Sequence, residues 1–519
     1  MSASRRRLTR RRALSEALGA GGGLVAVASG CAAALGIAGC GTSAGAGASA
    51  SGSTLRSTWS DPVGDGQLRV TAGEPLRERV ELGPRAAVST TLATFAHVTD
   101  AHVLDASSPA RISFLDRLGP PFQSTFRPQE ALTAQVLADT AAAIRSLSPE
   151  LVIQGGDLID NDQSNELRHA LSALIGGRVS PGSGRLGYYG VQLGSDTDPF
   201  YYRPAVDAPR HPRLLRDAVR PFLSRGAGAP VYPVLGDHDA LVAGTLLPTA
   251  LTRSLAIGSR ALWDLPSGLA LPQGARLSRV TSPDGPPDPG AVDQLLREAL
   301  RGPTVPVPPD PARRQLSFGE TVARLRRAGG PGAAVRDAGR LDYVIDAGAR
   351  LRFVVLDIVR RGGGSEGLID PAQPAWLAQQ LALAGERWVI VVTHQPIASS
   401  VGGDALFAIM DRAPRVIAAL HGHIHRNAII PRRTAAGGYW LIATASLIDY
   451  PQQARAIAVQ ATADGGIAIR TWMLDHAGAE ALGPIARQLS YLDPEGGRPR
   501  GASGSHADRN VILHRGPAH

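Results

Sequence analysis

The sequence contains no lysine and almost no cysteine, and both absences exclude whole classes of site. All 54 basic residues are arginine, so a phosphate-binding loop of the type Gly-x-x-x-x-Gly-Lys is excluded. The two cysteines are Cys31 and Cys40, and the chain beyond them has no thiol. A disulfide scaffold, a cysteine–zinc site and a cysteine nucleophile are therefore excluded from residue 41 onward.

The remaining composition is that of a globular protein, with 44% hydrophobic and 19% charged residues. The formal net charge is +9, but the first 39 residues hold six arginines and one glutamate, which leaves +4 for the rest. This small excess does not require a nucleic-acid partner. At roughly 150 residues per domain, 519 residues allow about three domains, or one large domain with insertions.

Residues 1–39 have the layout of an export signal. A basic stretch at 5–12 precedes an uncharged stretch rich in glycine and alanine at 17–39. Residues 9–14 (Thr-Arg-Arg-Arg-Ala-Leu) resemble the twin-arginine consensus, and residues 37–40 (Ile-Ala-Gly-Cys) resemble a lipobox. We expect an exported protein, either secreted or tethered to the cell envelope through a lipid on Cys40. An uncleaved membrane anchor is the alternative, and residues 41–58 are expected to form a flexible tether.

Apolar runs typical of buried strands alternate with helical patterns beyond about residue 90. Segment 40–90 is assigned to the tether and an N-terminal extension, and 91–475 to one α/β domain. Within that domain, 177–215 and 241–340 are expected to be loop-rich insertions. The segment 476–519 is expected to be a tail, loosely packed from about residue 495. We expect strands over 94–98, 151–153, 231–235, 353–356, 389–392 and 416–420, helices over 128–147 and 370–385, and a strand-turn-strand unit over 439–473.

Five short motifs, each directly after an apolar strand, contain the ligand types of a metal centre. Carboxylate and imidazole groups suit Mn, Fe, Zn or Co, and functional side chains gather at strand ends. Composition alone would produce Gly-His-x-His about 0.04 times in such a chain. The motifs are Asp100-Ala101-His102, Gly156-Asp157-Leu158-Ile159-Asp160-Asn161, Gly236-Asp237-His238-Asp239, the single His394, and Gly422-His423-Ile424-His425.

The spacing within the motifs suits two neighbouring ions. Two divalent ions about 3.5–4 Å apart need a bridging ligand and other ligands on each side. Alternate residues of an extended segment point to the same side, so Asp100 and His102 are expected to bind one ion from an extended segment. Asp157, on a glycine-containing turn after a strand, is well placed to bridge.

The order of these motifs resembles that of the calcineurin-like metallophosphoesterases, over roughly residues 91–475. The Gly-His-x-His form is most similar to the branch with cyclic-nucleotide and glycerophosphodiester phosphodiesterases. Ser108–Arg111 and Ser446–Gln453 also resemble an exported actinobacterial subgroup. The resemblance implies a four-layer α-β-β-α sandwich and hydrolysis of a small phosphate ester, most simply a diester, by a hydroxide that bridges two divalent ions (Mn, Fe, Zn or Co). The alternatives are a phosphomonoesterase or nucleotidase, or a non-catalytic envelope metal-binding protein.

The resemblance also implies a role for each motif residue. Asp157 would bridge the ions, and His238 would assist the leaving group and contact the substrate. Asp160 would orient His238, Asp239 is grouped with these two as catalytic, and Asn161 would contact the substrate. The ligands of the first ion would be Asp100, His102 and His425, and those of the second would be Asp237, His394 and His423.

Asp237 is a departure from the family pattern, which has asparagine at this position. The additional carboxylate reduces the formal charge of a site with two divalent ions from roughly +2 to roughly +1. We therefore expect tighter metal binding and a less acidic bridging water, with an alkaline shift of the pH optimum.

Overall fold

The structure is a computed structural model that describes residues 50–518 except 121, 123–124, 196–199, 264–279, 281–285, 303, 331–333, 336–338 and 477–481. The predicted signal, its twin-arginine motif and Cys40 lie outside the described residues. Across the described ranges, no helix is long and apolar enough to cross a membrane.

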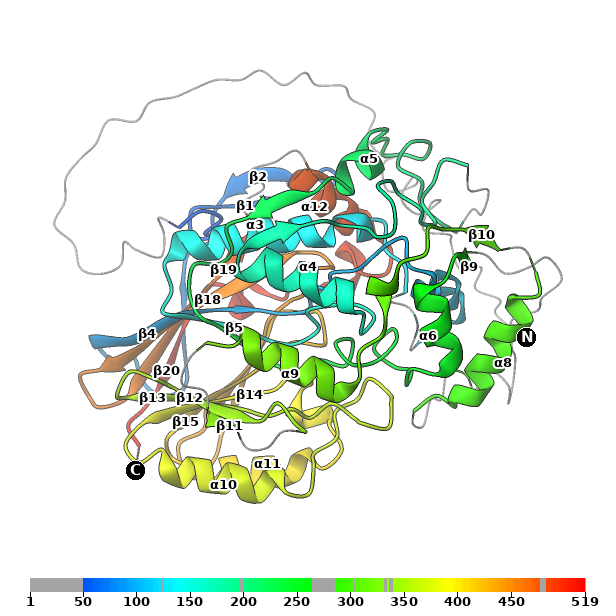
Figure 1. The fold of residues 1–519 in the computed structure, drawn as a ribbon. Helices are drawn as coiled ribbons and strands as arrows, with labels where there is room; N and C mark the ends of the chain where they lie inside the picture. Colours follow the sequence, from blue (N-terminus) through cyan, green and yellow to red (C-terminus); the bar gives the residue numbers. More distant parts are fainter. Residues whose placement is uncertain are drawn as a thin grey trace, which may run out of the picture.

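Two seven-stranded sheets pack face to face (Figure 1). Phe95 of one sheet meets Phe353 of the other edge-on, with ring centroids 5.0 Å apart. In order across sheet I, the strands are β3 (Arg77–Leu82), β20 (Val511–Arg515), β19 (Ile467–Asp475), β18 (Gln453–Thr462), β4 (Val88–Val98), β5 (Leu151–Gln154) and β8 (Val231–Pro233). In order across sheet II, they are β11 (Ala334–Val335), β12 (Tyr343–Ala347), β13 (Leu351–Val355), β14 (Trp388–Val392), β15 (Val416–His421), β17 (Tyr439–Ala443) and β16 (Ala428–Arg432).

Helices cover the outer faces of both sheets, which confirms the predicted four-layer α/β fold. The helix α3 (Thr133–Leu147) lies against β18 and β19 and contacts α4 (Ser164–Ile175) and α12 (Leu482–Leu492). Its buried face contains Val136, Thr140 and Ile144, and the buried Leu132 directly precedes the helix, as the sequence spacing predicts. On the other side, α10 (Gln373–Leu383) and α11 (Gly403–Met410) contribute to one apolar cluster with β13, β14 and β15.

Three parallel strands of sheet I and two of sheet II end at the same side of the sandwich. β5 pairs in parallel with both β4 and β8, and β14 pairs in parallel with β15. These are the five strands after which the sequence motifs occur. The topology therefore brings motifs that are far apart in the sequence to one edge of the fold.

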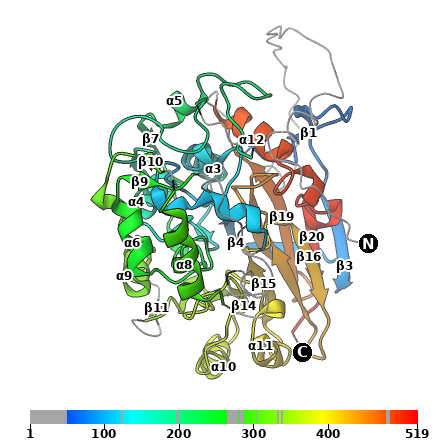
Figure 2. The ribbon, with the colours of Figure 1, turned by 90° about the vertical axis from the view of Figure 1, so that its right-hand side faces the viewer.

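The insertions add small elements beside the sandwich. The helices α6 (Ala250–Ile257) and α8 (Pro289–Ala299) share an apolar cluster with the short helix η2 (Ser113–Leu118), and they lie together in Figure 2. The helix α6 also contacts η1 (Pro109–Arg111). The other elements are α5 (Leu214–Ala218), α9 (Phe318–Ala328), the strand pairs β1 (Ser57–Ser60) with β2 (Arg69–Ala72), β6 (Gly177–Val179) with β7 (Phe222–Ser224) and β9 (Arg260–Ala261) with β10 (Val305–Pro306), and the single-turn helices η3 (Glu130–Leu132), η4 (Pro311–Arg313), η5 (Ile397–Ser399), η6 (Arg498–Arg500) and η7 (His506–Asp508).

Both ends of the described chain are better ordered than the sequence predicted. The expected tether is packed from residue 50: the Thr54 hydroxyl lies 2.9 Å from Met473 O and 2.9 Å from Asn510 Oδ1. The expected loose tail is also wrong, because β20 lies inside sheet I between β19 and β3. The short apolar run from Val511 to Leu513 is the sequence pattern that indicates this strand. The glycine- and arginine-rich sequence around it obscures that pattern.

This placement predicts a large effect of a change near the C-terminus. Leu513 is fully buried, so Leu513→Ala should reduce the free energy of unfolding by about 2–5 kcal/mol. Ile430→Ala is the control, because Ile430 is 57% exposed, and its effect should be within about 0.5 kcal/mol. Denaturant unfolding measures both, and equal effects of the two variants would contradict the packing of β20.

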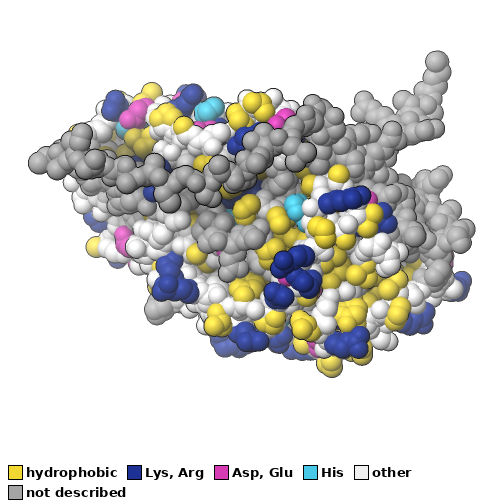
Figure 3. Space-filling view, turned by 90° about the horizontal axis from the view of Figure 1, so that it is seen from above, with side chains coloured by type: hydrophobic (Ala, Val, Ile, Leu, Met, Phe, Trp, Pro, Cys, Tyr) yellow, Lys and Arg dark blue, Asp and Glu magenta, His cyan; other side chains and the backbone are white. Residues whose placement is uncertain are grey.

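Basic side chains are dispersed on the surface seen in Figure 3. On this face they form separate groups among hydrophobic and uncharged side chains. The described part of the face therefore shows no continuous basic strip of the kind that follows a nucleic-acid backbone.

Candidate metal centre

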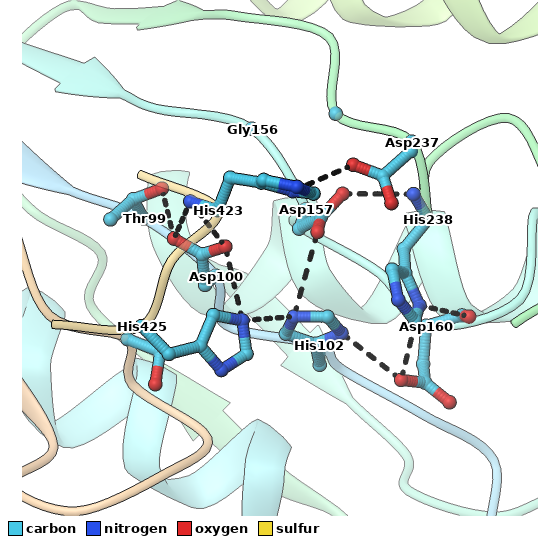
Figure 4. A network of polar contacts seen from close by, with 12 residues as sticks. Thr99, Asp100, His102, Gly156, Asp157, Asp160, Asp237, His238, His423 and His425 are labelled. Atoms are coloured by element: carbon cyan, nitrogen blue, oxygen red, sulfur yellow. Dashed lines mark hydrogen bonds and ion pairs between the residues drawn. The ribbon is translucent and has the colours of Figure 1, made fainter. Parts of the chain in front are cut away.

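The five motifs meet at the carboxyl ends of the parallel strands. Asp100 follows β4, Asp157 follows β5, and Asp237 follows β8 in sheet I. In sheet II, His394 follows β14 and the histidine pair His423 and His425 follows β15. Figure 4 shows Asp157 near the middle of the assembled side chains, with His425 and His238 on opposite sides.

The backbone of these loops is turned rather than extended. Asp100 and His102 have φ angles of 52° and 44°, and Asp157 has 48°. His423 and His425 have φ angles of 65° and 53°. The predicted extended segment at Asp100–His102 is therefore wrong. Non-glycine residues in the left-handed region cost of order 1–3 kcal/mol each and occur where surrounding structure holds them, commonly at functional sites.

Two glycines allow the loops to approach one another. A Cβ on Gly156, whose φ is +97°, would lie 2.3 Å from His394 Nδ1. A Cβ on Gly422 would lie 2.4 Å from Asp100 Oδ2. Side chains at either position would push a candidate ligand out of place.

Asp100, His102, Asp157 and His425 form the first ligand group, with ligand atoms that all lie within 4.8 Å of one another. His425 Nε2 lies 3.2 Å from His102 Nε2 and 3.2 Å from Asp100 Oδ1. His102 Nε2 lies 3.6 Å from Asp157 Oδ2. The residues expected around the first ion are thus together with the expected bridge.

Asp157, Asp237, His394 and His423 form the second ligand group, within the same 4.8 Å limit. His394 Nε2 lies 3.1 Å from Asp157 Oδ2 and 3.2 Å from Asp237 Oδ1, and His423 Nδ1 lies 3.2 Å from Asp237 Oδ1. Asp157 belongs to both groups. The structure assembles the two sets that the resemblance implies, and their role as ligands stays a prediction.

The residues fit divalent metal ions. Two ligand atoms about 2.1 Å from one ion at tetrahedral or octahedral angles are roughly 3.0–3.4 Å apart, close to the separations in both groups. His394 Nε2 is fully buried and has no hydrogen-bond partner, although two carboxylates face it. A buried imidazole nitrogen that is directed at carboxylates without a hydrogen bond is suited to a shared cation.

The other nitrogen of three histidines is held by a hydrogen bond. His102 Nδ1 donates to Asp160 Oδ1 (3.0 Å) and His425 Nδ1 donates to Asp449 Oδ2 (2.6 Å). His394 Nδ1 donates to the Gly155 carbonyl (2.8 Å). In each ring this leaves Nε2 for a metal ion, the usual arrangement of histidine ligands.

His238 lies beside the two ligand groups and faces the cavity. Its backbone N–H donates to Asp157 Oδ1 (2.8 Å), and its Nδ1 donates to the Asp160 carbonyl (2.9 Å). Burial lowers the pKa of His238, but the carboxylates of Asp157, Asp160 and Asp237 outweigh it and raise the pKa to about 10 in the metal-free chain. A protonated His238 is suited to give a proton to a leaving oxygen.

Both carboxylate oxygens of Asp160 accept hydrogen bonds. Besides His102, it accepts from Asn161 Nδ2 (3.2 Å) and pairs with the fully buried Arg111. Burial raises the pKa of Asp160, but Arg111 and the two histidines hold it well below its usual range. Asp160 therefore orients His102 through its side chain and His238 through its backbone carbonyl.

The structure places Asn161 and Asp239 inside the loops rather than in the cavity. Asn161 is fully buried, and its Oδ1 accepts from Ala243 N (2.8 Å). The expected substrate contact of Asn161 is therefore corrected to a bond between loops. Asp239 accepts from the backbone of Leu158, Ile159 and Gly236 at 2.8–3.1 Å. Its carboxylate holds two motif loops together and does not line the cavity.

A cavity of about 790 Å³ opens above the ligand groups. Most of its lining comes from residues outside the five motifs, which the sequence pattern did not indicate. The lining consists of His102, Asp157, Asp237, His238, His423, Ile424 and His425, of Gly119, Pro120, Arg127, Ala243, Thr245, Ser365 and Asp449, and of Asp493, Pro494, Glu495, Gly496, Pro499 and Arg500 from the C-terminal segment.

One of three comparisons with known proteins shows the family of the chain. The family model described as calcineurin-like phosphoesterase matches residues 93–427. A dimetal phosphatase from Danio rerio is similar in structure, at 13% identity and a TM-score of 0.35, over 74% of this chain and 99% of that one. The sulfate thiohydrolase SoxB of Thermus thermophilus, solved with glycerol, is similar at 12% identity and a TM-score of 0.29, over 78% of this chain and 60% of that one. No curated protein sequence matches the chain significantly.

Proposed function

The chain belongs to the calcineurin-like phosphoesterase family and is a metal-dependent phosphoester hydrolase, and from this premise we propose that its substrate is a small phosphodiester. The charge of the cavity supports the diester. Two divalent ions at the ligand groups, together with the carboxylates of Asp100, Asp157 and Asp237, leave a formal charge of roughly +1. A phosphodiester has one negative charge and a phosphomonoester up to two near neutral pH. The single charge of the diester therefore matches the charge of the site more closely.

Each group of residues has a distinct part in the proposed reaction. Two divalent ions bound at the ligand groups would lower the pKa of a water molecule and neutralise charge on the phosphoryl oxygens. Asp157 aligns the two groups, since its oxygens face His102, His394 and the His238 backbone. His238 delivers a proton to the departing alcohol, and Asp160 keeps the His238 ring in place.

The test is metal-dependent hydrolysis of bis(p-nitrophenyl) phosphate compared with p-nitrophenyl phosphate by the full-length protein, loaded with Mn. We expect a higher kcat/KM for the diester. The Asp157→Ala protein, purified in parallel, is the blank for contaminating phosphatases. A higher kcat/KM for the monoester would overturn the diester proposal in favour of a phosphomonoesterase or nucleotidase.

Asp237 gives a prediction about metal affinity and pH. Its Oδ1 faces His394, His423 and Gln395 Nε2 (3.1 Å), so Asp237→Asn removes a negative charge from the second ligand group without removing the oxygen. Metal binding should weaken about 10–100-fold. The extra net positive charge favours ionisation of the attacking water. The ascending limb of the pH–rate profile should therefore shift by roughly one pH unit toward acidic pH. An unchanged metal affinity and pH–rate profile would contradict this effect of Asp237.

We also propose that the protein is exported and tethered through Cys40. The basic stretch at 5–12 and the lipobox-like residues 37–40 support this. Cys40→Ala should move the protein from the membrane fraction to the soluble exported fraction and abolish labelling with a radioactive fatty acid. Full retention in the membrane fraction without label would indicate an uncleaved anchor instead.

A further inference from the structure

Two buried arginines lie behind the histidines of the first ligand group. Arg111 pairs with Asp160, whose other oxygen accepts from His102. Arg127 Nε donates to Asp449 Oδ1 (2.5 Å), and Asp449 Oδ2 accepts from His425. Arg127 Nη2 also donates to Asp449 Oδ2 (3.2 Å). Each aspartate thus binds a buried arginine and a histidine of the first ligand group at the same time. Neither pair was evident from the sequence, because the partners are distant along the chain.

The second ligand group is supported differently. His394 donates to a neutral backbone carbonyl, that of Gly155. A backbone carbonyl is fixed by the chain, whereas a carboxylate can rotate about its side-chain bonds. An aspartate therefore needs a second contact before it can fix the orientation of an imidazole ring.

The two arginines provide that second contact from a rigid position. Arg111 and Arg127 are 1% and 4% exposed. Arg111 is held on its far side by Glu130 (2.7 Å) and the Thr125 carbonyl (2.6 Å). A guanidinium group is planar and presents its donors in a fixed fork, so it sets the plane of the carboxylate that it binds.

We propose that Arg111 and Arg127 are positioning residues that prepare the first ligand group for a divalent ion. They fix Asp160 and Asp449, which in turn hold His102 and His425 as the tautomers with Nε2 free. The proposal rests on the proposed function only for the assignment of the metal ligands. These arginines therefore act in metal binding, unlike arginines whose ion pairs only stabilise the fold.

The test is calorimetric titration of the metal-free full-length protein with Mn²⁺ or Co²⁺. His425→Ala and His423→Ala identify the binding steps of the first and second ligand groups. Arg111→Met and Arg127→Met should each weaken the first step about 10–100-fold and leave the second within threefold. Co²⁺ absorption spectra should change for the first ion only.

Arg432→Met is the matched control. Arg432 donates to both carboxylate oxygens of Asp411 (2.7 and 2.6 Å) outside the two ligand groups and the cavity lining, so both steps should match the wild type. If Arg111→Met does not fold, Arg111→Lys, which retains the charge without the fork, is measured in its place. Wild-type affinity in the folded arginine variants, or equal weakening of both steps, would overturn the proposal. No ester is present, so failure of the diester proposal leaves this result unchanged.

Discussion

Replacement of His238 with alanine should lower kcat about 10²–10⁴-fold while both metal ions stay bound. His238 belongs to neither of the two ligand groups, although it forms a third cluster with His102 and Asp160, and its Nδ1 donates to the Asp160 carbonyl. Its Nε2 is therefore the atom available to the substrate in the cavity. Metal content per chain and kcat, measured on the same preparation, separate the loss of a proton donor from the loss of an ion.

The size of the expected loss in kcat depends on the leaving group of the substrate. p-Nitrophenolate departs without a proton, whereas an alkoxide requires one. The loss in His238→Ala should therefore be greatest for diesters with an alkyl leaving group. His169→Ala is the control, since His169 is a buried histidine that bonds to Ser180 N outside the site. An equal loss for both leaving groups would exclude proton donation by His238.

Asp157→Ala should remove the activity almost completely and disturb both ions. Asp157 is the residue shared by the two ligand groups. Loss of the ions removes several kcal/mol of transition-state stabilisation, so kcat/KM should fall about 10³-fold or more. Metal analysis should give at most one ion per chain.

Two single-group variants provide the comparison for Asp157→Ala. His425→Ala removes a member of the first group only and His423→Ala a member of the second only. Each should reduce the metal content by about one ion per chain. Two ions retained in Asp157→Ala would show that another residue bridges them.

The sequence was sufficient to predict the architecture and to select the residues that the structure brings together in the two ligand groups. Each motif is short and follows a strand whose apolar run is visible locally, such as Val389–Val392 before His394. Because carboxyl ends of neighbouring parallel strands converge, strand assignment alone predicts that the motifs meet. The direction of Asp100 and His102 could not be predicted in this way, because it depends on left-handed backbone that the folded loops impose.

The supporting residues could not be recognised from the sequence, for a different reason. Asp449 acts on His425, and Arg111 acts on Asp160, through contacts that only the topology creates. One arginine among 54 has no local pattern that distinguishes it. In sequence, Ser108–Arg111 and Ser446–Gln453 resemble a subgroup of the family, and the structure shows that Arg111 and Asp449 within them contact Asp160 and His425.

The order of strands in sheet I has a consequence for biosynthesis. The edge strand β3 pairs with β20, so most of the described chain lies between the two partners. At about 5–20 residues per second, roughly 20–90 s separate the two strands during translation. For most of that interval the nascent chain also lacks the cavity wall formed by residues 493–500. Closure of the sheet therefore waits for β20, and a chain truncated before β20 would present β3 and β19 as two unpaired edges.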